Sequence, residues 1–213
     1  DREDMPFTIG SVGRPINGLQ VKIGDNDEIL LKGPTITPGY YKRDAVNKEA
    51  FTEDGFFRTG DAGYIKNGEL FLTDRIKDLF KTSNGKYIAP QMIESLLLVD
   101  KFIDQVVVIA NERKFVSALI VPEFRLVEEW AKDHGVEFET REDLCANAKV
   151  NKMMMDRIQT LQQQLAHYEQ IKRFTLIAHH FSMESGELTN TLKIRRPVIY
   201  KNFKEVIDKM YEE

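Results

Sequence analysis

Apolar and polar residues alternate over several short runs in the first third of the chain, a pattern typical of half-buried β-strands. Glycine, proline, asparagine and aspartate separate these runs, and each of these residue types favours a turn. One separator, Asn67-Gly68, is the dipeptide preferred in two-residue β-hairpins of type I′. Short strands at this spacing predict a small β-barrel or curled sheet over residues 1–76, with a short helix at 44–51.

The remainder of the chain combines helical and strand patterns, so the predicted fold class is α+β. Apolar residues three or four positions apart predict amphipathic helices over 90–97, 124–134, 148–168 and 197–210. Two apolar runs, 106–109 and 116–121, flank a short turn and predict an antiparallel hairpin, with one more strand at 171–178. Because 106–109 is apolar on both faces, we expect helices to cover this sheet.

The apolar stripe of the helix expected at 148–168 has two interpretations. It could be a seam that binds a partner helix, or a face that packs on the neighbouring sheet. The stripe runs for fewer than four heptads, whereas a coiled coil usually sustains its pattern for longer. Packing on the sheet is therefore the favoured interpretation.

The composition of the chain argues against some classes of function but does not identify the function. The 213 residues carry a net charge of −4, which argues against general affinity for nucleic acid or acidic membranes. The single cysteine, Cys145, leaves no internal disulfide and is expected to be a small buried residue. None of the four histidines lies in a ligand pattern, so no metal site is predicted. The chain begins with Asp1 and not with methionine, so we expect a piece of a longer protein.

Basic residues gather around a glycine turn in the middle of the chain. Arg75, Lys77, Lys81 and Lys86 lie close in sequence to Asn84-Gly85. Guanidinium and ammonium groups around a glycine turn suit an anionic ligand such as a phosphate. A solvated hairpin whose charges keep the protein soluble would have the same composition, so composition alone leaves both interpretations open.

Three sequence motifs favour the anion-binding interpretation. They are Arg58-Thr59-Gly60-Asp61, then Asp74-Arg75-Ile76-Lys77-Asp78 with Ile88-Ala89-Pro90 and Ile93-Glu94, and finally Gly186-Glu187-Leu188-Thr189-Asn190-Thr191-Leu192-Lys193. In this order they resemble the signatures of adenylate-forming enzymes, which include acyl-CoA synthetases, luciferases and the adenylation domains of peptide synthetases. The residues are most similar to those of long-chain fatty-acid–CoA ligases, although Asn190 stands where those ligases usually have a second proline.

The resemblance implies two domains that meet at Lys77. Residues 1–76 would be the end of a large AMP-binding domain, with the β-barrel-like sheet described above. Residues 77–213 would be a mobile C-terminal α+β domain, in which helices flank a short antiparallel sheet. Lys77 would be the hinge, at a position where many relatives have an aspartate.

The resemblance also implies a role for five other residues. Asp61 and Arg75 would hold the ribose of ATP. Lys193 would be the catalytic residue that stabilises the charge developing on the α-phosphate and the attacking carboxylate. Lys81 and Gly85 would belong to a different face of the mobile domain, which is presented during thioester formation.

The implied reaction of the whole protein has two steps and uses ATP, Mg²⁺ and coenzyme A. A fatty-acid carboxylate attacks the α-phosphate of ATP, and the thiol of coenzyme A then displaces AMP from the acyl-adenylate. Mg²⁺ and most of the ATP contacts are expected from a part upstream of Asp1, so residues 1–213 alone are expected to be inactive. Alternatives are transfer of the acyl group to a carrier protein, luciferase-like oxidation, or a non-catalytic binding module.

The expected partners are fatty acid, ATP and coenzyme A, and no nucleic acid. No apolar run approaches the ~20 residues that span a bilayer. The expected location is the cytoplasm, and the resemblance allows the whole enzyme to associate peripherally with the inner face of the membrane. A second copy of this chain is a candidate partner, which would make a homodimer.

Overall fold

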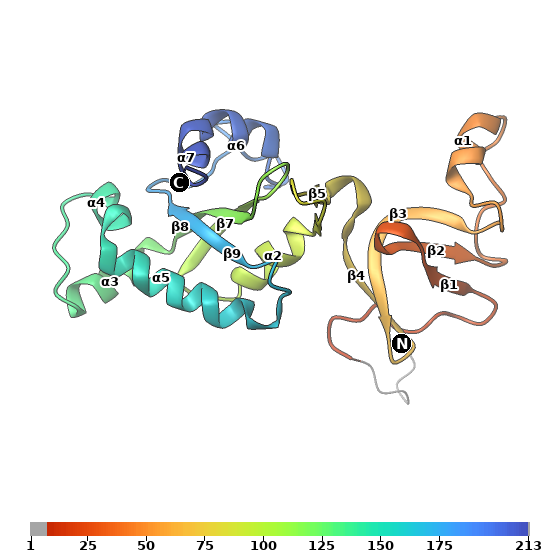
Figure 1. Cartoon of the computed structure of the whole chain (residues 1–213), viewed down its shortest axis with the longest axis horizontal. Coiled ribbons are helices and arrows are strands. Elements are labelled where there is room, and N and C mark those ends of the chain that lie inside the picture. Colours follow the sequence, from red (N-terminus) through yellow and green to blue (C-terminus); the bar gives the residue numbers. More distant parts are fainter. Residues whose placement is uncertain (1–7, 213) are drawn as a thin grey trace. The chain divides into compact units, whose positions relative to one another are not determined.

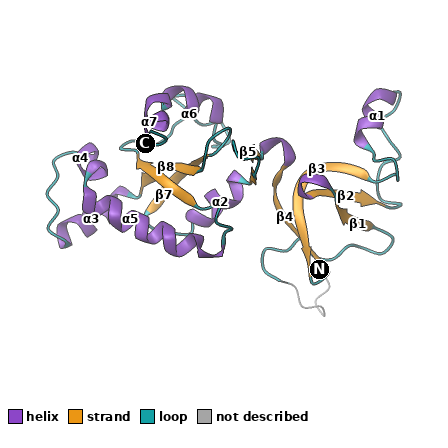
Figure 2. Cartoon of the chain, in the orientation of Figure 1, coloured by secondary structure: helices purple, strands orange, loops and turns teal. Residues whose placement is uncertain are grey.

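The computed structural model describes residues 8–212, and the chain divides into two compact units, 1–79 and 80–213 (Figure 1). The first unit contains a four-stranded antiparallel sheet in the order β1-β2-β3-β4. Its strands are β1 (Gln20–Ile23), β2 (Glu28–Lys32), β3 (Phe57–Lys66) and β4 (Glu69–Arg75). The sheet curls around the long strand β3, and α1 (Asp44–Ala50) lies outside it (Figure 2). The predicted curled sheet and the short helix are confirmed.

The hairpin between β3 and β4 turns at Asn67-Gly68, as predicted. Both residues have positive φ, 53° and 78°, which is the conformation that a type I′ turn requires. Lys66 lies opposite Glu69 next to the turn, and the register continues without interruption to Gly63 and Leu72. A β-bulge then shifts the register between Ala62 and Gly63.

Gly63 is required by the close approach of these two strands. A Cβ atom at this position would overlap the Phe71 carbonyl oxygen and lie 2.7 Å from Cδ1 of Ile29. We therefore expect Gly63→Ala to lower the free energy of opening of β3 and β4 by about 1–3 kcal/mol. Hydrogen exchange of the strand amides measures this opening, and the exposed Lys66→Ala should change it by less than about 0.5 kcal/mol. Equal effects of the two variants would contradict the steric argument.

The second unit is built on a three-stranded sheet in the order β7-β8-β9. The predicted hairpin is confirmed: β7 (Ile103–Ile109) pairs antiparallel with β8 (Val116–Pro122). The third strand, β9 (Ile171–Leu176), pairs parallel with β8, so the sheet is mixed where an antiparallel one was expected. The physical reason is the connection, because a long helical crossover returns the chain to the same end of the sheet before β9 begins.

Helices cover both faces of this sheet, as the apolar pattern predicts. They are α2 (Pro90–Leu97), α3 (Phe124–Asp133), α4 (Arg141–Ala146), α5 (Ala148–Leu161), α6 (Arg196–Asn202) and α7 (Lys204–Lys209). Figure 1 shows α6 and α7 on one side of the sheet and α2, α3 and α5 on the other. Val107, Val108 and Ile109 are completely buried between these layers. A two-stranded sheet, β5 (Phe80–Lys81) and β6 (Tyr87–Ile88), precedes α2.

Two helices are shorter than their apolar patterns predict. The helix expected over 148–168 ends at Leu161, because the buried side chain of Gln162 binds the backbone of Ile171. Its Nε2 donates to the Ile171 carbonyl at 3.3 Å, and its Oε1 accepts the Ile171 N–H at 2.8 Å. The helix expected over 197–210 is interrupted at Phe203, whose φ of −107° and ψ of 20° separate α6 from α7.

The apolar stripe of α5 packs inward. Val150, Met154 and Ile158 are fully buried and belong to the same hydrophobic core as β7 and β8. This arrangement confirms that the stripe packs on the neighbouring sheet. Cys145, at the end of α4, is also buried as expected, and burial raises the pKa of its thiol to about 11. The thiol is therefore protonated at neutral pH and unsuited to nucleophilic chemistry.

Candidate functional site

Asp61 and Arg75 lie opposite each other on β3 and β4. Their Cα atoms are cross-strand partners, and Arg75 Nε is 3.5 Å from Asp61 Oδ1. The Arg75 side chain is 75% exposed and that of Asp61 is 37% exposed. The hairpin thus presents a carboxylate and a guanidinium side by side to solvent, with donor and acceptor capacity for a polyhydroxylated, anionic ligand.

The β-bulge is what pairs these two residues. If the register of the turn continued along the strands, Asp61 would lie opposite Asp74, and two like charges would meet. The bulge places one extra residue in β4, so that Ala62 faces Asp74 and Asp61 faces Arg75. The Asp74 carboxylate then accepts the backbone N–H of Arg75 at 2.8 Å. The sequence motifs identified Asp61 and Arg75, but nothing in the sequence indicated the register shift that pairs them.

The segment before Asp61 is fixed by hydrogen bonds to β2. Thr59 donates its hydroxyl to the Ile29 carbonyl at 2.7 Å and accepts the Asp61 N–H at 3.1 Å. Gly60 has a φ of +72° and donates its N–H to the buried carboxylate of Glu28 at 3.2 Å. These contacts hold the Asp61 backbone in place while its carboxylate remains open to a ligand.

Lys77 lies in a short 3-10 turn, Ile76–Asp78, that directly follows β4. Its side chain is exposed, and the turn closes with a hydrogen bond of 3.1 Å from Leu79 N–H to the Arg75 carbonyl. The two compact units meet just beyond this turn, between Leu79 and Phe80. Lys77 therefore lies in an exposed connecting segment, and its role as a hinge stays a prediction.

Lys81 and Gly85 belong to the small β5-β6 hairpin of the second unit. Gly85 has a φ of +76°, and no atom lies within 4 Å of the place where its Cβ would be. The hairpin is held by the turn that joins β7 and β8: Glu112 N–H donates to the Lys81 carbonyl at 2.8 Å, and Ser83 N–H to the Arg113 carbonyl at 3.0 Å. A ligand can therefore reach Gly85 and the exposed Lys81 side chain, while the hydrogen bonds to the β7-β8 turn hold the backbone of the hairpin in place.

Lys193 projects from a tight loop of the second unit. Thr189 N–H donates to the Lys193 carbonyl at 2.8 Å, and the Thr189 hydroxyl accepts the Lys193 N–H at 3.1 Å. Leu192, which precedes the lysine, has a φ of +59°. At the base of the loop, the buried carboxylate of Glu187 accepts hydrogen bonds from Ser185 Oγ at 2.6 Å and Asn202 Nδ2 at 3.1 Å. The exposed ammonium group of Lys193 therefore stands on an ordered backbone.

One buried ion pair joins the bases of the Lys193 loop and the Lys81 hairpin. Arg196 donates two hydrogen bonds to Glu94 of α2, Nη1 to Oε1 at 2.8 Å and Nη2 to Oε2 at 2.7 Å. Glu94 Oε1 also accepts the Val108 N–H at 2.8 Å, and the Arg196 guanidinium lies 5.2 Å from the Phe80 ring centroid. Glu94 stands in one of the three sequence motifs, but the sequence alone did not indicate that it pairs with Arg196.

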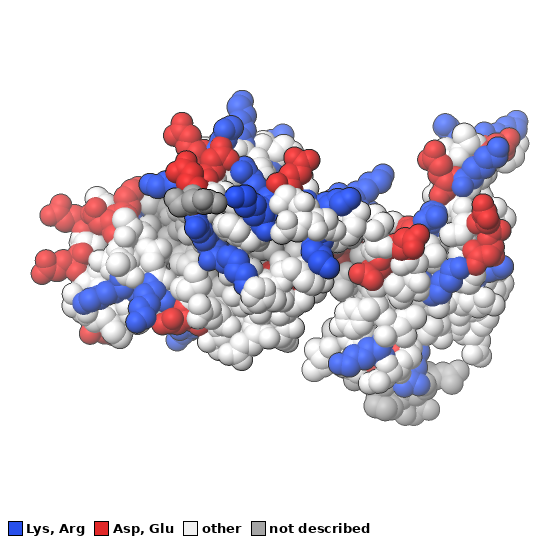
Figure 3. All heavy atoms as spheres, in the orientation of Figure 1, with Lys and Arg blue, Asp and Glu red and all other residues white. Residues whose placement is uncertain are grey.

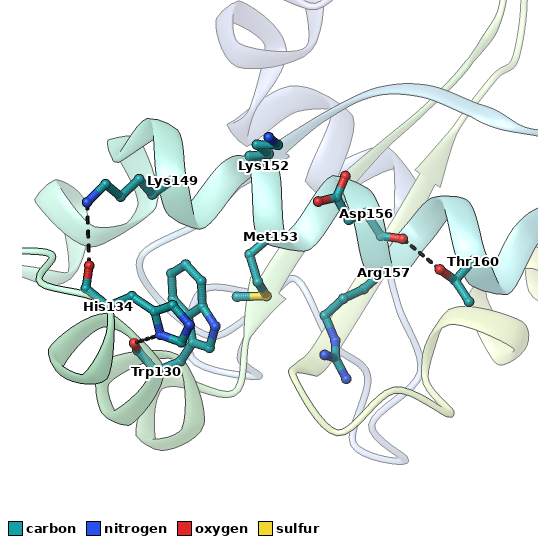
Figure 4. Close-up of a pocket in the computed structure, with 8 residues that line it drawn as sticks. All are labelled: Trp130, His134, Lys149, Lys152, Met153, Asp156, Arg157 and Thr160. Carbon is teal, nitrogen blue, oxygen red and sulfur yellow. Dashed lines mark hydrogen bonds between the residues drawn. The ribbon is translucent and has the colours of Figure 1, made fainter.

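A groove of about 570 Å³ lies between α3 and α5, and its lining residues all fall between Trp130 and Thr160. Figure 4 shows the Trp130 ring stacked on the His134 ring, and their centroids are 4.2 Å apart. Lys149 Nζ donates to the His134 carbonyl at 3.4 Å at one end of the groove. None of the residues singled out by the family motifs lines it, so we assign it no part in the predicted site.

Residues 8–212 contain neither a metal-binding cluster of side chains nor a helix that could span a membrane. In this range no group of three or more His, Cys, Asp or Glu side chains could hold a metal ion together. No described helix is both long enough and apolar enough to cross a membrane.

The chain is similar in sequence to known proteins along most of its length. The sequence model of the AMP-binding enzyme C-terminal domain matches residues 77–213. Long-chain-fatty-acid–CoA ligase 1 of Homo sapiens is 34% identical over 220 residues, which cover 96% of this chain and 31% of that protein. The ligase FadD15 of Mycobacterium tuberculosis is 31% identical over 215 residues, covering 96% of this chain and 34% of that protein. The chain thus spans about a third of the length of these curated relatives.

Solved structures show the same relationship. The adenylation domain of a carboxylate reductase from Mycobacterium chelonae has a TM-score of 0.62 and 27% identity, covering 87% of this chain and 28% of that one. The corresponding domain from Segniliparus rugosus, in complex with AMP and a co-purified carboxylic acid, has a TM-score of 0.61 and 26% identity, covering 86% and 28%. Since the C-terminal domain model matches the greater part of its length, the chain belongs to the AMP-binding, adenylate-forming enzyme family.

Proposed function

We propose that this chain is part of an ATP-dependent long-chain fatty-acid–CoA ligase and supplies its ribose-binding pair and its mobile domain. The main support is the exposed Lys193, held on an ordered loop of a unit that matches the AMP-binding C-terminal domain. The similarity to long-chain-fatty-acid–CoA ligases supports a fatty acid as the substrate class. The whole protein's two steps follow from this assignment.

In the first step, a carboxylate oxygen of the fatty acid forms a bond to the α-phosphorus of ATP, and the bond to pyrophosphate breaks. Lys193 would stabilise the negative charge that builds on the phosphoryl oxygens and the attacking carboxylate. Asp61 would accept hydrogen bonds from the ribose hydroxyls, with Arg75 beside it, each charge-assisted bond contributing about 1.5–3 kcal/mol. ATP would arrive with Mg²⁺, to which we assign no residue of this chain.

In the second step, the thiol of coenzyme A loses its proton to solvent, its sulfur forms a bond to the acyl carbon, and the bond from that carbon to the phosphate oxygen of AMP breaks. We propose that the second unit rotates about Lys77 between the steps, so that Lys193 leaves the nucleotide and the hairpin with Lys81 and Gly85 takes its place. A few backbone dihedrals can absorb such a rotation.

Lys77→Pro in the full-length protein tests the hinge. Proline fixes φ near −65° and restricts Ile76 as well, so the segment loses the freedom that rotation needs. We expect thioester formation to slow by up to about 10²-fold, while acyl-adenylate formation changes little. Lys77→Ala, which keeps backbone freedom, should leave both steps near wild type. Equal losses in both steps of Lys77→Pro would show that the pivot lies elsewhere.

Product analysis of the full-length protein tests the function itself. Given ATP and palmitate, it should release pyrophosphate, and addition of coenzyme A should yield AMP and palmitoyl-CoA. Acyl transfer to a carrier protein in preference to coenzyme A would favour the carrier-loading alternative. An oxidised product would favour luciferase-like chemistry. Absence of any fatty-acid-dependent pyrophosphate release would leave only a non-catalytic binding module.

A further inference from the structure

The strand β9 has an open edge. It is the last strand in the order β7-β8-β9 and pairs with β8 on one side, while no strand within residues 8–212 pairs with the other. At its start this outer edge is closed, because Gln162 binds both backbone groups of Ile171. Beyond Ile171, no described side chain forms a comparable pair of hydrogen bonds with the backbone of β9. An uncovered edge presents backbone N–H and C=O groups that can pair with another extended segment.

A groove of about 680 Å³ runs along this edge, between α5 and α7. The groove is lined by four cationic side chains, which are Lys152, Lys172, Arg173 and Lys209. No aspartate or glutamate is among the described residues that line it. Figure 3 shows Lys and Arg atoms gathered over β9. Met155 and Phe174 add apolar surface between the charges. The groove therefore combines positive charge, apolar contact and an open strand edge.

The charges lie on both faces of the strand. Lys152 is on α5 and Lys209 is on α7, and these two helices cover opposite faces of the sheet. Arg173 is on the side of the C-terminal segment, since its guanidinium donates to the Met210 carbonyl at 2.9 Å and the Glu212 carbonyl at 2.6 Å. A segment paired with β9 would thus meet positive charge whichever way each of its side chains points.

We infer that the edge of β9 binds an acidic peptide segment of a partner protein in extended conformation, as a fourth strand of the sheet. Backbone pairing would supply the register, the cations would select carboxylates, and the apolar surface would accept side chains between them. A second copy of this chain is disfavoured, because pairing the β9 edges of two copies would bring two grooves lined by the same cations together. This inference is independent of the proposed catalytic function.

Fluorescence anisotropy with the whole chain tests the inference, using a labelled, acetylated peptide of about eight residues that alternates valine and glutamate. We expect saturable binding that weakens as salt is raised. The same peptide with lysine in place of glutamate should bind at least about tenfold more weakly. A peptide with a central proline should also lose about tenfold, because proline removes a backbone donor.

Two variants locate the binding on the protein. The double change Lys172→Glu and Lys209→Glu should weaken binding of the acidic peptide by about tenfold, whereas Lys201→Glu on α6 should leave it within about twofold. Hydrogen exchange should show β9 amides protected by the peptide. Equal affinity for the proline peptide, or unchanged exchange at β9, would overturn the inference. Self-association of the chain that protects the β9 amides and blocks binding of the peptide would overturn it in favour of a second copy at this edge.

Discussion

Lys193→Ala in the full-length protein is expected to slow fatty-acid-dependent pyrophosphate release by about 10²–10³-fold. The side chain of Lys193 is exposed, and two hydrogen bonds to Thr189 hold its backbone, so the base of this side chain is fixed before the substrate binds. Loss of one preorganised charge donor typically removes about 2.7–4 kcal/mol of transition-state stabilisation. Stopped-flow detection of pyrophosphate with ATP and palmitate measures this rate.

Lys201→Ala is the matched control, because Lys201 is an exposed lysine on the neighbouring helix α6. It should leave pyrophosphate release near wild type. Lys193→Arg should restore part of the lost rate, since it keeps the positive charge but changes its shape. A rate for Lys193→Ala within about threefold of wild type would mean that this charge does not act in the transition state.

Glu94→Ala is expected to destabilise the second unit by about 3–5 kcal/mol, because it leaves the Arg196 guanidinium largely buried without its counter-charge. The pair is well shielded, with side-chain exposures of 20% for Arg196 and 9% for Glu94. The change also removes the acceptor of the Val108 N–H in the core strand β7. Denaturant unfolding followed by the fluorescence of Trp130, which lies in this unit, measures the loss.

An exposed ion pair in the same unit provides the control. Glu129 pairs with Arg125 at 3.7 Å on the surface of α3, so Glu129→Ala should change the free energy of unfolding by less than about 0.5 kcal/mol. Because Arg196 joins the bases of the Lys193 loop and the Lys81 hairpin, Arg196→Lys should impair both half-reactions together. If Glu94→Ala were as mild as Glu129→Ala, the buried pair would not support these loops.

Features set by neighbouring residues could be predicted from the sequence. The hairpin at Asn67-Gly68 needs two residues with positive φ in a row, and this dipeptide supplies them. Likewise, Pro90 opens α2 because its fixed φ suits the first turn of a helix. The family motifs then identified Asp61, Arg75 and Lys193 as candidates without any knowledge of their surroundings.

Features set by distant contacts could not be predicted. The bulge that pairs Asp61 with Arg75 adjoins Gly63, whose close packing against Phe71 has no local signature. Glu94 and Arg196 are 102 positions apart, so the sequence does not indicate that they pair. The sequence did contain one sign of a buried ion pair, because a glutamate between Ile93 and Leu97 on a buried helix requires a cationic partner. The early end of α5 likewise depends on hydrogen bonds between Gln162 and Ile171, the first residue of β9, which lies nine positions further along the chain.

The most direct measurement compares the two half-reactions in Lys193→Ala and Lys81→Ala forms of the full-length protein. Pyrophosphate release from ATP and palmitate reports the first step, and thioester formation from pre-made palmitoyl-adenylate and coenzyme A reports the second. If the second unit presents different faces in turn, Lys193→Ala should lose the first step and keep the second, and Lys81→Ala should show the reverse. Parallel losses of both steps in both variants would contradict the alternation of faces and leave the two lysines as supports of the fold.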